Sequence, residues 1–357
     1  QGVLPGLGAA TDEDMPQAPP PSPPASKKKS LFFLLKIGVS LCLLAYVIWK
    51  AGLNSKEGRE ALWLTLGDVN LLYFFLSLAT GVFMTTISSW KWQVLLRSRD
   101  IHVPLGRLVQ FYFIGRFFNL FLPTSMGGDV VRVWELGRHS GKKYDALASV
   151  FVERLSGMVT LAVISIVAVL LELHRYDLPI LNLSLLFLAS VILVIFWMIL
   201  DRRLLQFFFS LVGQRFTLAK RLFKKIERIQ DAIREYKDDP ITLLQVFLIS
   251  CLFYFMAVVN VWISAMAFFQ EVTFSSMLLA VPAIMLVMNL PISIGGIGLM
   301  EAAFALLFPL FGYPAALALS TALLMRFKTI LYGITGGILH LGRLRVQPVQ
   351  KKTEKTP

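Results

Sequence analysis

The stretch Leu122-Pro123-Thr124-Ser125-Met126-Gly127-Gly128 has a second form, Leu290-Pro291-Ile292-Ser293-Ile294-Gly295-Gly296, in the other half of the chain. Five of the seven positions are identical, and each copy ends a long apolar run. The likeness continues downstream, because Arg154 and Arg326 follow related Ala/Leu/Ser segments at the same spacing. An apolar chain in which proline and glycine interrupt a helix in both halves is typical of membrane transporters built from structural repeats.

Composition places the chain among integral membrane proteins. Hydrophobic residues make up 56% of the 357 residues, and charged residues only 16%. Several apolar runs reach the roughly 20 residues that an α-helix needs to cross a bilayer. The apolar runs are 31–50, 69–90, 108–122, 146–171, 180–200, 241–269, 276–311 and 316–341. The composition therefore predicts an all-α polytopic membrane protein.

The net charge of +13 lies mainly in short segments beside the apolar runs, which follows the positive-inside rule and argues against a nucleic-acid partner. The segments rich in lysine and arginine are 26–30, 91–107, 129–145, 201–240 and 341–357. The segments with few of them are 51–70, 173–180, 270–276 and 311–315. This asymmetry predicts cytoplasmic termini, and we expect the protein in the inner (cytoplasmic) membrane of a bacterial cell.

The same distribution predicts two re-entrant hairpins. The first break lies between two basic segments, so its chain should enter and leave on the cytoplasmic side. The second break lies between two segments poor in charge, so its hairpin should enter from outside. Two related hairpins of opposite direction form an inverted repeat, and their tips should line a cavity covered by protein. About six full spans remain: 31–50, 69–90, 146–171, 180–200, 241–269 and 316–341.

The chain divides into a membrane domain with two tails. Residues 1–29 are rich in proline and lack the apolar content for a core, so we expect a disordered cytoplasmic tail. Residues 30–342 form the membrane domain, with repeat halves at about 30–200 and 241–342, and 343–357 form a second cytoplasmic tail. The linker 201–240 is basic and amphipathic. It either docks onto anionic lipid headgroups or is a solvated helical linker.

Charged side chains are costly inside apolar runs, and each is a candidate for function. The arginines could hold a lipid phosphate through bidentate hydrogen bonds, and the carboxylates could balance them or meet a substrate amine. The alternative is that the charges are structural ion pairs and the glycines only allow tight packing. The candidate substrate-binding residues are Arg116, Asn119, Pro123, Ser125, Gly127, Gly128, Asp129, Arg132, Glu153, Arg154, Pro291, Ser293, Gly295, Gly296, Glu301 and Arg326.

Some of these charges have an expected position. Asp129 and Arg132 should share one helix face, near the cytoplasmic boundary. Arg154 and Arg326 should approach the cavity from opposite sides of the membrane. Each should pair with an acid on another helix or bind phosphate, and Glu153 and Glu301 are the nearest acids by type. Arg154 cannot pair with Glu153 within one helix, because adjacent residues point apart.

No cofactor or metal is expected. The four histidines are scattered near the ends of the apolar runs and form no HExxH motif. Cys42 and Cys251 both lie in apolar runs, so there is no disulfide framework and no CxxC metal site. The sequence also has neither a phosphate-binding P-loop nor a GxSxG nucleophile elbow, and no catalytic residue is assigned.

Three motifs in order carry a family resemblance. Residues 119–132 (NLFLPTSMGGDVVR), 152–157 (VERLSG) and 291–301 (PISIGGIGLME) resemble signatures of the lysylphosphatidylglycerol synthase transmembrane-domain family. The resemblance covers roughly 30–342 and implies a flippase-like membrane protein. In the best-known members this domain moves an aminoacylated phospholipid between leaflets, and a separate soluble domain makes the lipid. No synthase domain is expected here, because the chain stops at Pro357 shortly after the last run.

The resemblance does not define the substrate. Standalone relatives are associated with several lipids, including hopanoid-type and polyprenyl-linked molecules, and one archaeal branch with glycosyl transfer. We expect a lipid flippase or scramblase whose partners are a membrane lipid and anionic headgroups at the cytoplasmic face. One alternative is a membrane glycosyltransferase using a polyprenyl-phosphate sugar, with Asp129 and Glu135 as its carboxylates, although no DxD motif is present. Another alternative is that the protein is a non-catalytic partner of a lipid-synthesis enzyme. The chain could also form a homo-oligomer.

Overall fold

The computed structural model describes residues 27–50, 52–122, 127–172, 179–200, 236, 239–268, 271–289, 293 and 295–346. Every regular element within them is a helix, as the composition predicts. Most of the predicted tails and of the linker 201–240 lies outside the described residues. The helices are α1 (Lys27–Lys50), α2 (Lys56–Gly67), α3 (Leu71–Arg97), α4 (Leu105–Phe121), α5 (Gly127–Ser140), α6 (Lys143–Glu172), α7 (Pro179–Leu200), α10 (Pro240–Met266), α11 (Phe274–Met288), α12 (Leu299–Leu307), the 3-10 helix η2 (Phe308–Phe311) and α13 (Ala315–Val346).

Four helices are long and apolar enough to cross a bilayer. They are α3, α6, α10 and α13, over Leu71–Arg97, Tyr144–Leu171, Pro240–Met266 and Ala315–Gly342. At 1.5 Å per residue, a helix of this length measures about 40 Å and exceeds the ~30 Å hydrocarbon core. These helices correspond to four of the six predicted spans. The other two predicted spans coincide with α1 and α7. Side chains are described only over 35–50 of α1 and 179–194 of α7, and each of these ranges is shorter than a span.

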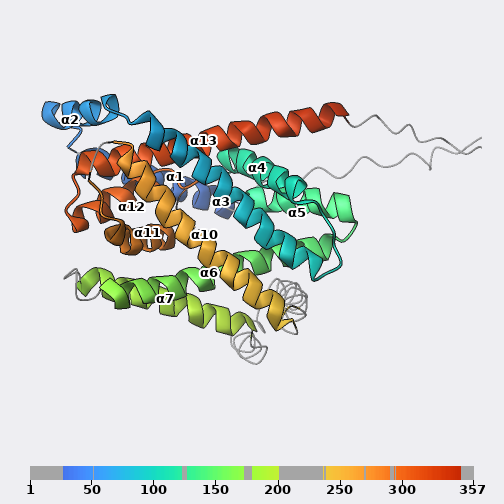
Figure 1. Ribbon diagram of the computed structural model, residues 1–357. Helices are drawn as coiled ribbons and strands as arrows, with labels where there is room; N and C mark the ends of the chain where they lie inside the picture. The colour runs from blue at the N-terminus through green and yellow to red at the C-terminus, as the bar shows by residue number, and fades with distance from the viewer. Residues whose placement is uncertain are drawn as a thin grey trace, which may run out of the picture.

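The chain on either side of each Pro/Gly break forms helices that are too short to cross. α4 and α5 have 17 and 14 residues, and α11 and α12 have 15 and 9. Even α4 is only about 26 Å long. In Figure 1, α4 and α5 lie in the right-hand half of the bundle, whereas α11 and α12 lie in the left-hand half. The chain therefore forms two hairpins that enter from opposite ends, as the lysine and arginine distribution predicts.

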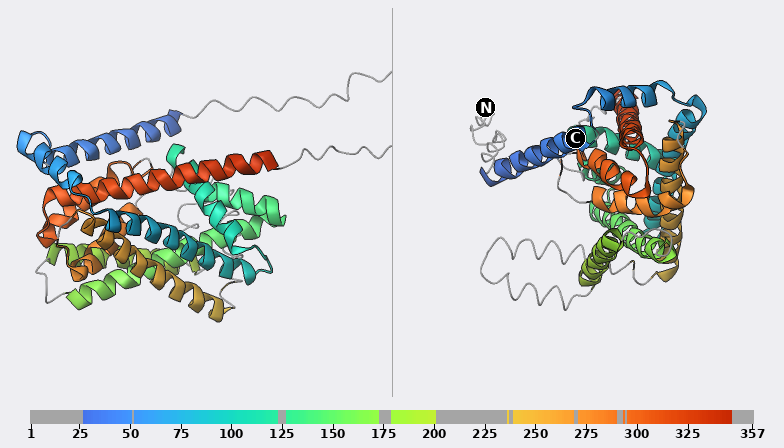
Figure 2. Two further views of the ribbon diagram at one scale, coloured as in Figure 1. Left: turned by 45° about the horizontal axis from the view of Figure 1, so that its top comes forward. Right: turned by 90° about the vertical axis from the view of Figure 1, so that its left-hand side faces the viewer.

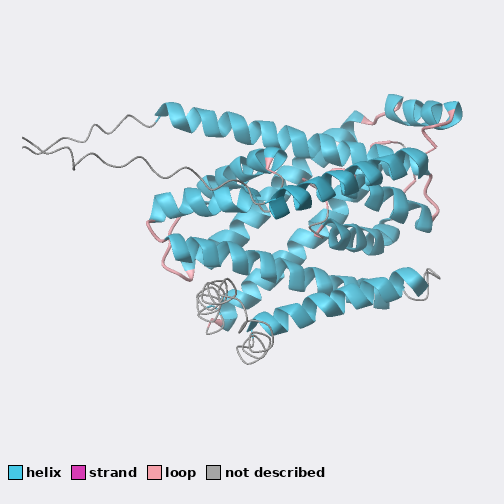
Figure 3. Cartoon of the chain, turned by 180° about the vertical axis from the view of Figure 1, so that it is seen from behind, coloured by secondary structure: helices cyan, strands magenta, loops and turns pink. Residues whose placement is uncertain are grey.

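The long helices hold these hairpins in the bundle. α3 and α10 pack against each other and run in opposite directions (Figure 1). α13 packs along α4, and Figure 2 shows the two helices from other sides. The main hydrophobic core joins α6, α10, α11, α12 and α13. Figure 3 shows the bundle from behind, with helices as the sole regular structure in the described chain.

Two of the long helices, α3 and α10, begin at a side chain that caps the helix. The Asn70 side chain accepts hydrogen bonds from the amides of Leu72 and Tyr73, at 3.0 and 3.4 Å, at the start of α3. Asp239 precedes Pro240 and accepts from the amide of Thr242 at 3.0 Å, at the start of α10. Asparagine and aspartate are preferred N-caps, and proline suits the first helical position.

The two breaks differ in backbone. In the first break, α5 begins at Gly127, inside the motif. In the second, the chain makes a turn in which Gly295, Gly296 and Gly298 have φ of +57°, +74° and +77°, and α12 begins only at Leu299. These angles lie in the left-handed region that glycine adopts without strain. The second break is therefore longer than the first, although their motifs are alike.

Candidate functional site

A polar cavity of about 240 Å³ lies where the α4–α5 hairpin meets α3, α6 and α10. Charged side chains reach it from four helices, although it lies within an apolar bundle. The polar and charged residues that line it are Ser88, Lys91, Tyr112, Arg116, Asn119, Asp129, Arg132, Glu153, Arg154, Tyr254 and Asn289. Seven of the sequence-predicted site residues line this cavity: Arg116, Asn119, Gly128, Asp129, Arg132, Glu153 and Arg154.

A chain of ion pairs crosses the cavity. Arg132 bonds to Glu153 at 2.5 Å and to Asp129 at 3.2 Å. Asp129 also bonds to Arg154 at 2.7 Å. The side chain of Arg132 is 4% exposed, whereas that of Arg154 is 42% exposed. The network therefore runs from a buried pair of charges to an arginine that is open to a ligand.

The contacts of Arg132, Arg154 and Asp129 can be compared with the sequence-based expectations. Arg132 is buried, because α5 starts at the hairpin tip and its first turns line the cavity; the position of Asp129 and Arg132 near the cytoplasmic boundary stays a prediction. Arg154 was expected to pair with an acid on another helix or to bind phosphate, and it pairs across helices with Asp129. The expected contact between Asp129 and Arg132 on one helix face is present.

Aromatic rings hold the buried arginine in place. The Arg132 guanidinium lies 4.3 Å from the ring centre of Trp92 and 3.6 Å from that of Tyr112. Tyr112 donates its hydroxyl hydrogen bond to the Glu153 carboxylate, and Trp92 donates to Ser149 at 3.0 Å. Cation–π contacts are stronger when the cation is desolvated. The orientation of the guanidinium is therefore set before any ligand arrives.

Two glycines bring α4 and α5 together at the cavity. A Cβ on Gly128 would overlap the backbone carbonyl of Gly115. The side chain of Asn119 accepts a hydrogen bond from the amide of Gly128 at 2.6 Å. Glycine at position 128 therefore allows the close backbone approach that the motif predicts, and Asn119 satisfies an amide near the start of α5.

The second break forms a more closed arrangement. Arg326 bonds to both oxygens of Glu301, at 2.8 and 3.0 Å, and to the carbonyls of Gly295 and Gly296, at 3.4 and 2.8 Å. Glu301 also accepts from the amide of Gly298 at 2.9 Å. Arg326 therefore fastens the glycine turn to α12 and α13. None of these residues lines the polar cavity.

The two breaks nevertheless adjoin. A Cβ built on Gly295 would lie 3.7 Å from the carbonyl oxygen of Asn119, at the end of the first hairpin. Asn289, which ends α11, lines the polar cavity. Gly127 is buried against Leu122, and Ser293 is also buried. The remaining predicted site residues, Pro123, Ser125 and Pro291, lie outside the described residues.

Three residues that sequence reasoning missed belong to the buried polar structure. Lys91 lines the cavity and is 6% exposed, but the sequence assigned it to a cytoplasmic basic segment. Tyr112 has no signal in the sequence, because an aromatic residue in an apolar run is ordinary. Lys328 lies within the last apolar run and is 3% exposed. The rule that selected Arg326, a charge inside an apolar run, also selects Lys328.

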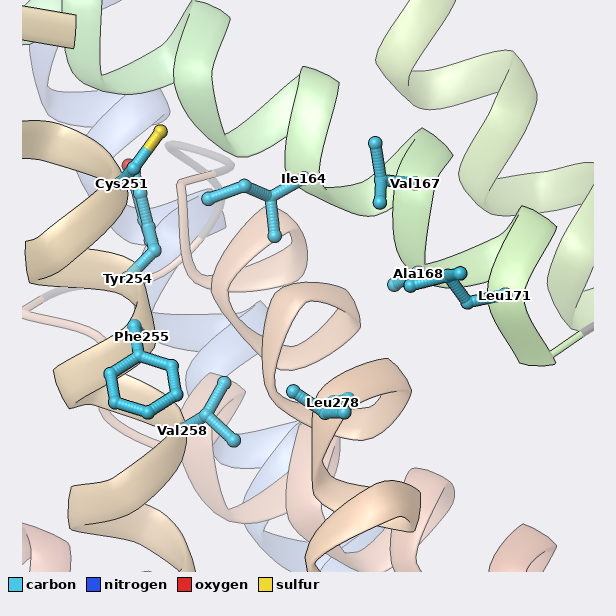
Figure 4. A pocket seen from close by; sticks show the side chains of 9 residues that line it. All are labelled: Ile164, Val167, Ala168, Leu171, Cys251, Tyr254, Phe255, Val258 and Leu278. Carbon is cyan, nitrogen blue, oxygen red and sulfur yellow. The ribbon is translucent and has the colours of Figure 1, made fainter. Parts of the chain in front are cut away.

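A second cavity, apolar and about 200 Å³, lies between α6, α10 and α11 (Figure 4). Tyr254 lines both cavities, and its hydroxyl donates to the carbonyl of Gly157 at 2.8 Å. Val167, Leu171 and Phe255, which line the apolar cavity, are exposed on the outer surface. The polar cavity therefore shares a wall with an apolar cavity at the surface of the bundle.

Among the described residues, no group of three His, Cys, Asp or Glu residues could hold a metal ion.

Comparison with known proteins agrees with this architecture. The family model for the lysylphosphatidylglycerol synthase TM region matches residues 33–337. A curated relative, the UPF0104 membrane protein PH1989 of Pyrococcus horikoshii, is 25% identical over 334 residues, which cover 87% of this chain and 96% of the relative. The family match includes both breaks and most of every long helix, so this multi-pass membrane protein belongs to the lysylphosphatidylglycerol synthase transmembrane-region family.

Proposed function

We propose that the protein moves a lipid with a phosphate-containing headgroup between the two leaflets of its membrane, as a flippase or scramblase. The observation that carries the proposal is the polar cavity within the bundle. A route for a headgroup needs polar groups at membrane depth, because hydrocarbon cannot solvate a charge.

The charges of the cavity favour an anionic group. Four cations line it, Lys91, Arg116, Arg132 and Arg154, against two carboxylates, Asp129 and Glu153. The excess of positive charge in surroundings of low dielectric favours a phosphate, and arginine can bind phosphate through two parallel hydrogen bonds. Arg154 is the most accessible of the three arginines of the cavity that were predicted from the sequence. We assign it the first contact with the phosphate.

The size of the cavity fits a headgroup without its tails. About 240 Å³ is below the range of pockets that enclose whole drug-sized molecules, about 300–1,000 Å³. Acyl chains would stay in the bilayer, beside apolar surfaces such as those of α6 and α10. Family membership supports a membrane-associated role in lipid handling. To this general role we add two specific points: the lipid moves between leaflets, and its headgroup contains a phosphate.

Glycosyl transfer is less well supported. Asp129, one of its two candidate carboxylates, is bound by two arginines. Glu135 lies on the same helix, and its carboxylate is 4.0 Å from the imidazole of His340. Asp129 lines the polar cavity, but Glu135 does not. The two carboxylates therefore do not face a common site.

The test is leaflet exchange in liposomes that contain the purified protein. Fluorescent phosphatidylglycerol, phosphatidylethanolamine and phosphatidylcholine report exchange when dithionite bleaches the outer leaflet. We expect faster loss of inner-leaflet fluorescence than in protein-free liposomes for at least one of these lipids. Rates equal to those of protein-free liposomes for all three contradict the proposal for phospholipids. Sugar release from a polyprenyl-phosphate sugar would instead support the enzyme.

A further inference from the structure

Lys328 lies in the middle of the last span and forms a second buried polar cluster. The part of α13 that is long and apolar enough to cross the membrane is Ala315–Gly342, and Lys328 within it is 3% exposed. Its Nζ donates to the side-chain oxygen of Asn260 at 2.9 Å and to the hydroxyl of Ser264 at 2.8 Å, both on α10. Neither partner is charged. An ionisable residue inside a membrane is a candidate for function, and this one does not line the polar cavity.

The surrounding hydrogen bonds define which groups accept. The Asn260 amide nitrogen donates to the carbonyl of Ser77 at 3.0 Å and to the hydroxyl of Thr80 at 2.5 Å, both on α3. The Asn260 oxygen must therefore face Lys328. The Ser264 hydroxyl donates to the carbonyl of Asn260 at 2.5 Å, so its oxygen accepts from Lys328. A neutral amine has two N–H groups, which match these two acceptors.

Charged groups on the neighbouring helices do not supply a counter-ion among the described residues. Of the elements packed against α13, α12 carries Glu301, which is bound to Arg326. α4 carries the cations Arg107 and Arg116, and η2 carries no ionisable group. The charged residues of α2, Lys56, Glu57, Arg59 and Glu60, are exposed. α10 and α3 present to Lys328 the neutral groups already named. A permanent positive charge here would be uncompensated, which low-dielectric surroundings disfavour.

Lys328 is also connected to the polar cavity. Tyr332 lies one turn further along α13, on the same helix face. Its hydroxyl donates to the carbonyl of Leu78 on α3 at 2.8 Å. The guanidinium of Arg116, which lines the cavity, lies 5.3 Å from the centre of the Tyr332 ring. A change in how α13 is held against α3 and α10 therefore reaches a cavity side chain through direct contacts.

We propose that Lys328 is a proton-binding site: its amine is uncharged in this conformation, and it takes up one proton when α13 shifts relative to α3 and α10 during lipid movement. The proton comes from water and bonds to the Nζ lone pair, and it is released when the bonds to Asn260 and Ser264 form again. A proton gradient would then bias the direction of the lipid movement proposed above. The inference rests on that proposed function for its role, but the proton binding itself can be measured without transport.

The first experiment measures lipid exchange under a pH gradient. Liposomes with purified protein, potassium and valinomycin receive an outside pH one unit above or below the inside pH. For one proton per cycle, this gradient changes the ratio of inward to outward exchange by up to about tenfold. We expect a several-fold change in the wild type and in the control Lys142→Met, whose lysine is exposed. In Lys328→Met, we expect the ratio of inward to outward exchange to stay the same whether or not the gradient is applied. Exchange that ignores the gradient in the wild type, or a gradient response that survives in Lys328→Met, overturns the proposal.

The second experiment needs no transport. Thermal unfolding in detergent is followed from pH 6 to pH 9 for the wild type, Lys328→Met and Lys142→Met. Free lysine is protonated below about pH 10, so unfolding of a protein with a neutral Lys328 takes up a proton. The midpoint of the wild type should therefore fall relative to Lys328→Met as the pH is lowered. Parallel curves overturn the proposal even if lipid exchange is established. If Lys328→Met does not fold, the double variant Lys328→Met/Asn260→Leu, which removes the amide partner as well, takes its place.

Discussion

The two breaks have related motifs and equivalent ion pairs, but the ion pair of the first lines the polar cavity, whereas that of the second does not. Asp129 is the third residue of α5 and Glu301 the third residue of α12. Each pairs with the arginine 25 positions later, Arg154 or Arg326. The repeat therefore extends from the motif to a contact between the short helix and the following long helix. Both repeats therefore contain this outer pair, but Arg154 lines the polar cavity, whereas Arg326 is held by the glycine turn.

The inner positions are where the repeats diverge. Arg132 is the sixth residue of α5, and the sixth residue of α12 is Phe304. Glu153 directly precedes Arg154, and Met325 directly precedes Arg326. Phe304 is buried and packs on Phe308, with ring centres 5.2 Å apart. One repeat therefore has a buried ion pair where the other has apolar packing. The inner ion pair is therefore specific to the first repeat, whereas the outer pair occurs in both.

The largest expected effect comes from giving the first repeat the inner residues of the second. Arg132→Phe alone leaves Glu153 buried without its main partner, and losing one member of a buried pair typically costs about 3–5 kcal/mol. The double variant Arg132→Phe/Glu153→Met should recover most of this stability, because apolar groups can replace a buried ion pair at little cost. Lipid exchange should be lost in both.

Thermal unfolding in detergent and leaflet exchange in liposomes check this prediction. Phe304→Leu in the second repeat is the matched control, since it changes apolar packing and leaves the cavity intact. A double variant that folds and exchanges lipid at the wild-type rate would remove the inner pair from the proposed mechanism.

A smaller effect should distinguish the glycines of the two breaks. Gly128→Ala places a Cβ against the backbone of Gly115, so α4 and α5 must separate, at a cost of about 1–3 kcal/mol, and exchange should stop. Gly296→Ala meets only the flexible end of Met288, at 3.3 Å. Its φ of +74° costs about 1–2 kcal/mol, but exchange should continue. Equal exchange rates in the two variants would show that the close approach of α4 and α5 is not needed.

Lysine replacements test the outer pairs. Arg326→Lys loses several of the hydrogen bonds to Glu301 and the glycine turn, so we expect a stability loss of about 1–2 kcal/mol. Arg154→Lys should change stability by less than about 0.5 kcal/mol, because the side chain is 42% exposed. Its exchange rate should nevertheless fall, since lysine cannot bind phosphate with a bidentate fork. The opposite pattern, with Arg326→Lys stable and inactive, would place the phosphate at the second break.

The smallest effect concerns the caps of α3 and α10. Hydrogen bonds from the side chain and amide of Thr242 hold the pKa of Asp239 below its ordinary value. The cap contributes stability above the unfolded pKa of about 4, and this is lost as the pH falls through the lower folded pKa. Asp239→Asn should remove this dependence at a cost of less than about 1 kcal/mol. Midpoints measured between pH 3 and pH 6 should fall more steeply in the wild type. Asn70→Asp should introduce a similar slope at α3.

The sequence by itself determined the class of protein and the plan of the chain. Apolar runs, two Pro/Gly breaks and the asymmetry of lysine and arginine predicted long helices and two opposed hairpins. These are local properties, because a run of about 20 apolar residues can satisfy its backbone in a membrane only as a helix. The equivalence of Arg154 and Arg326 was also readable, since each follows a related Ala/Leu/Ser segment at the same spacing.

Only the tertiary structure decided which charges meet. Spacing along one helix brings Asp129 to Arg132, but the pairing of Asp129 with Arg154 and of Arg132 with Glu153 depends on how α5 packs against α6. The burial of Lys91 and Lys328 likewise depends on where neighbouring helices supply hydrogen-bond acceptors. A charge within an apolar run indicates that some partner must exist. The partner lies on another helix, and its identity follows from the packing of side chains between helices, which no local pattern contains.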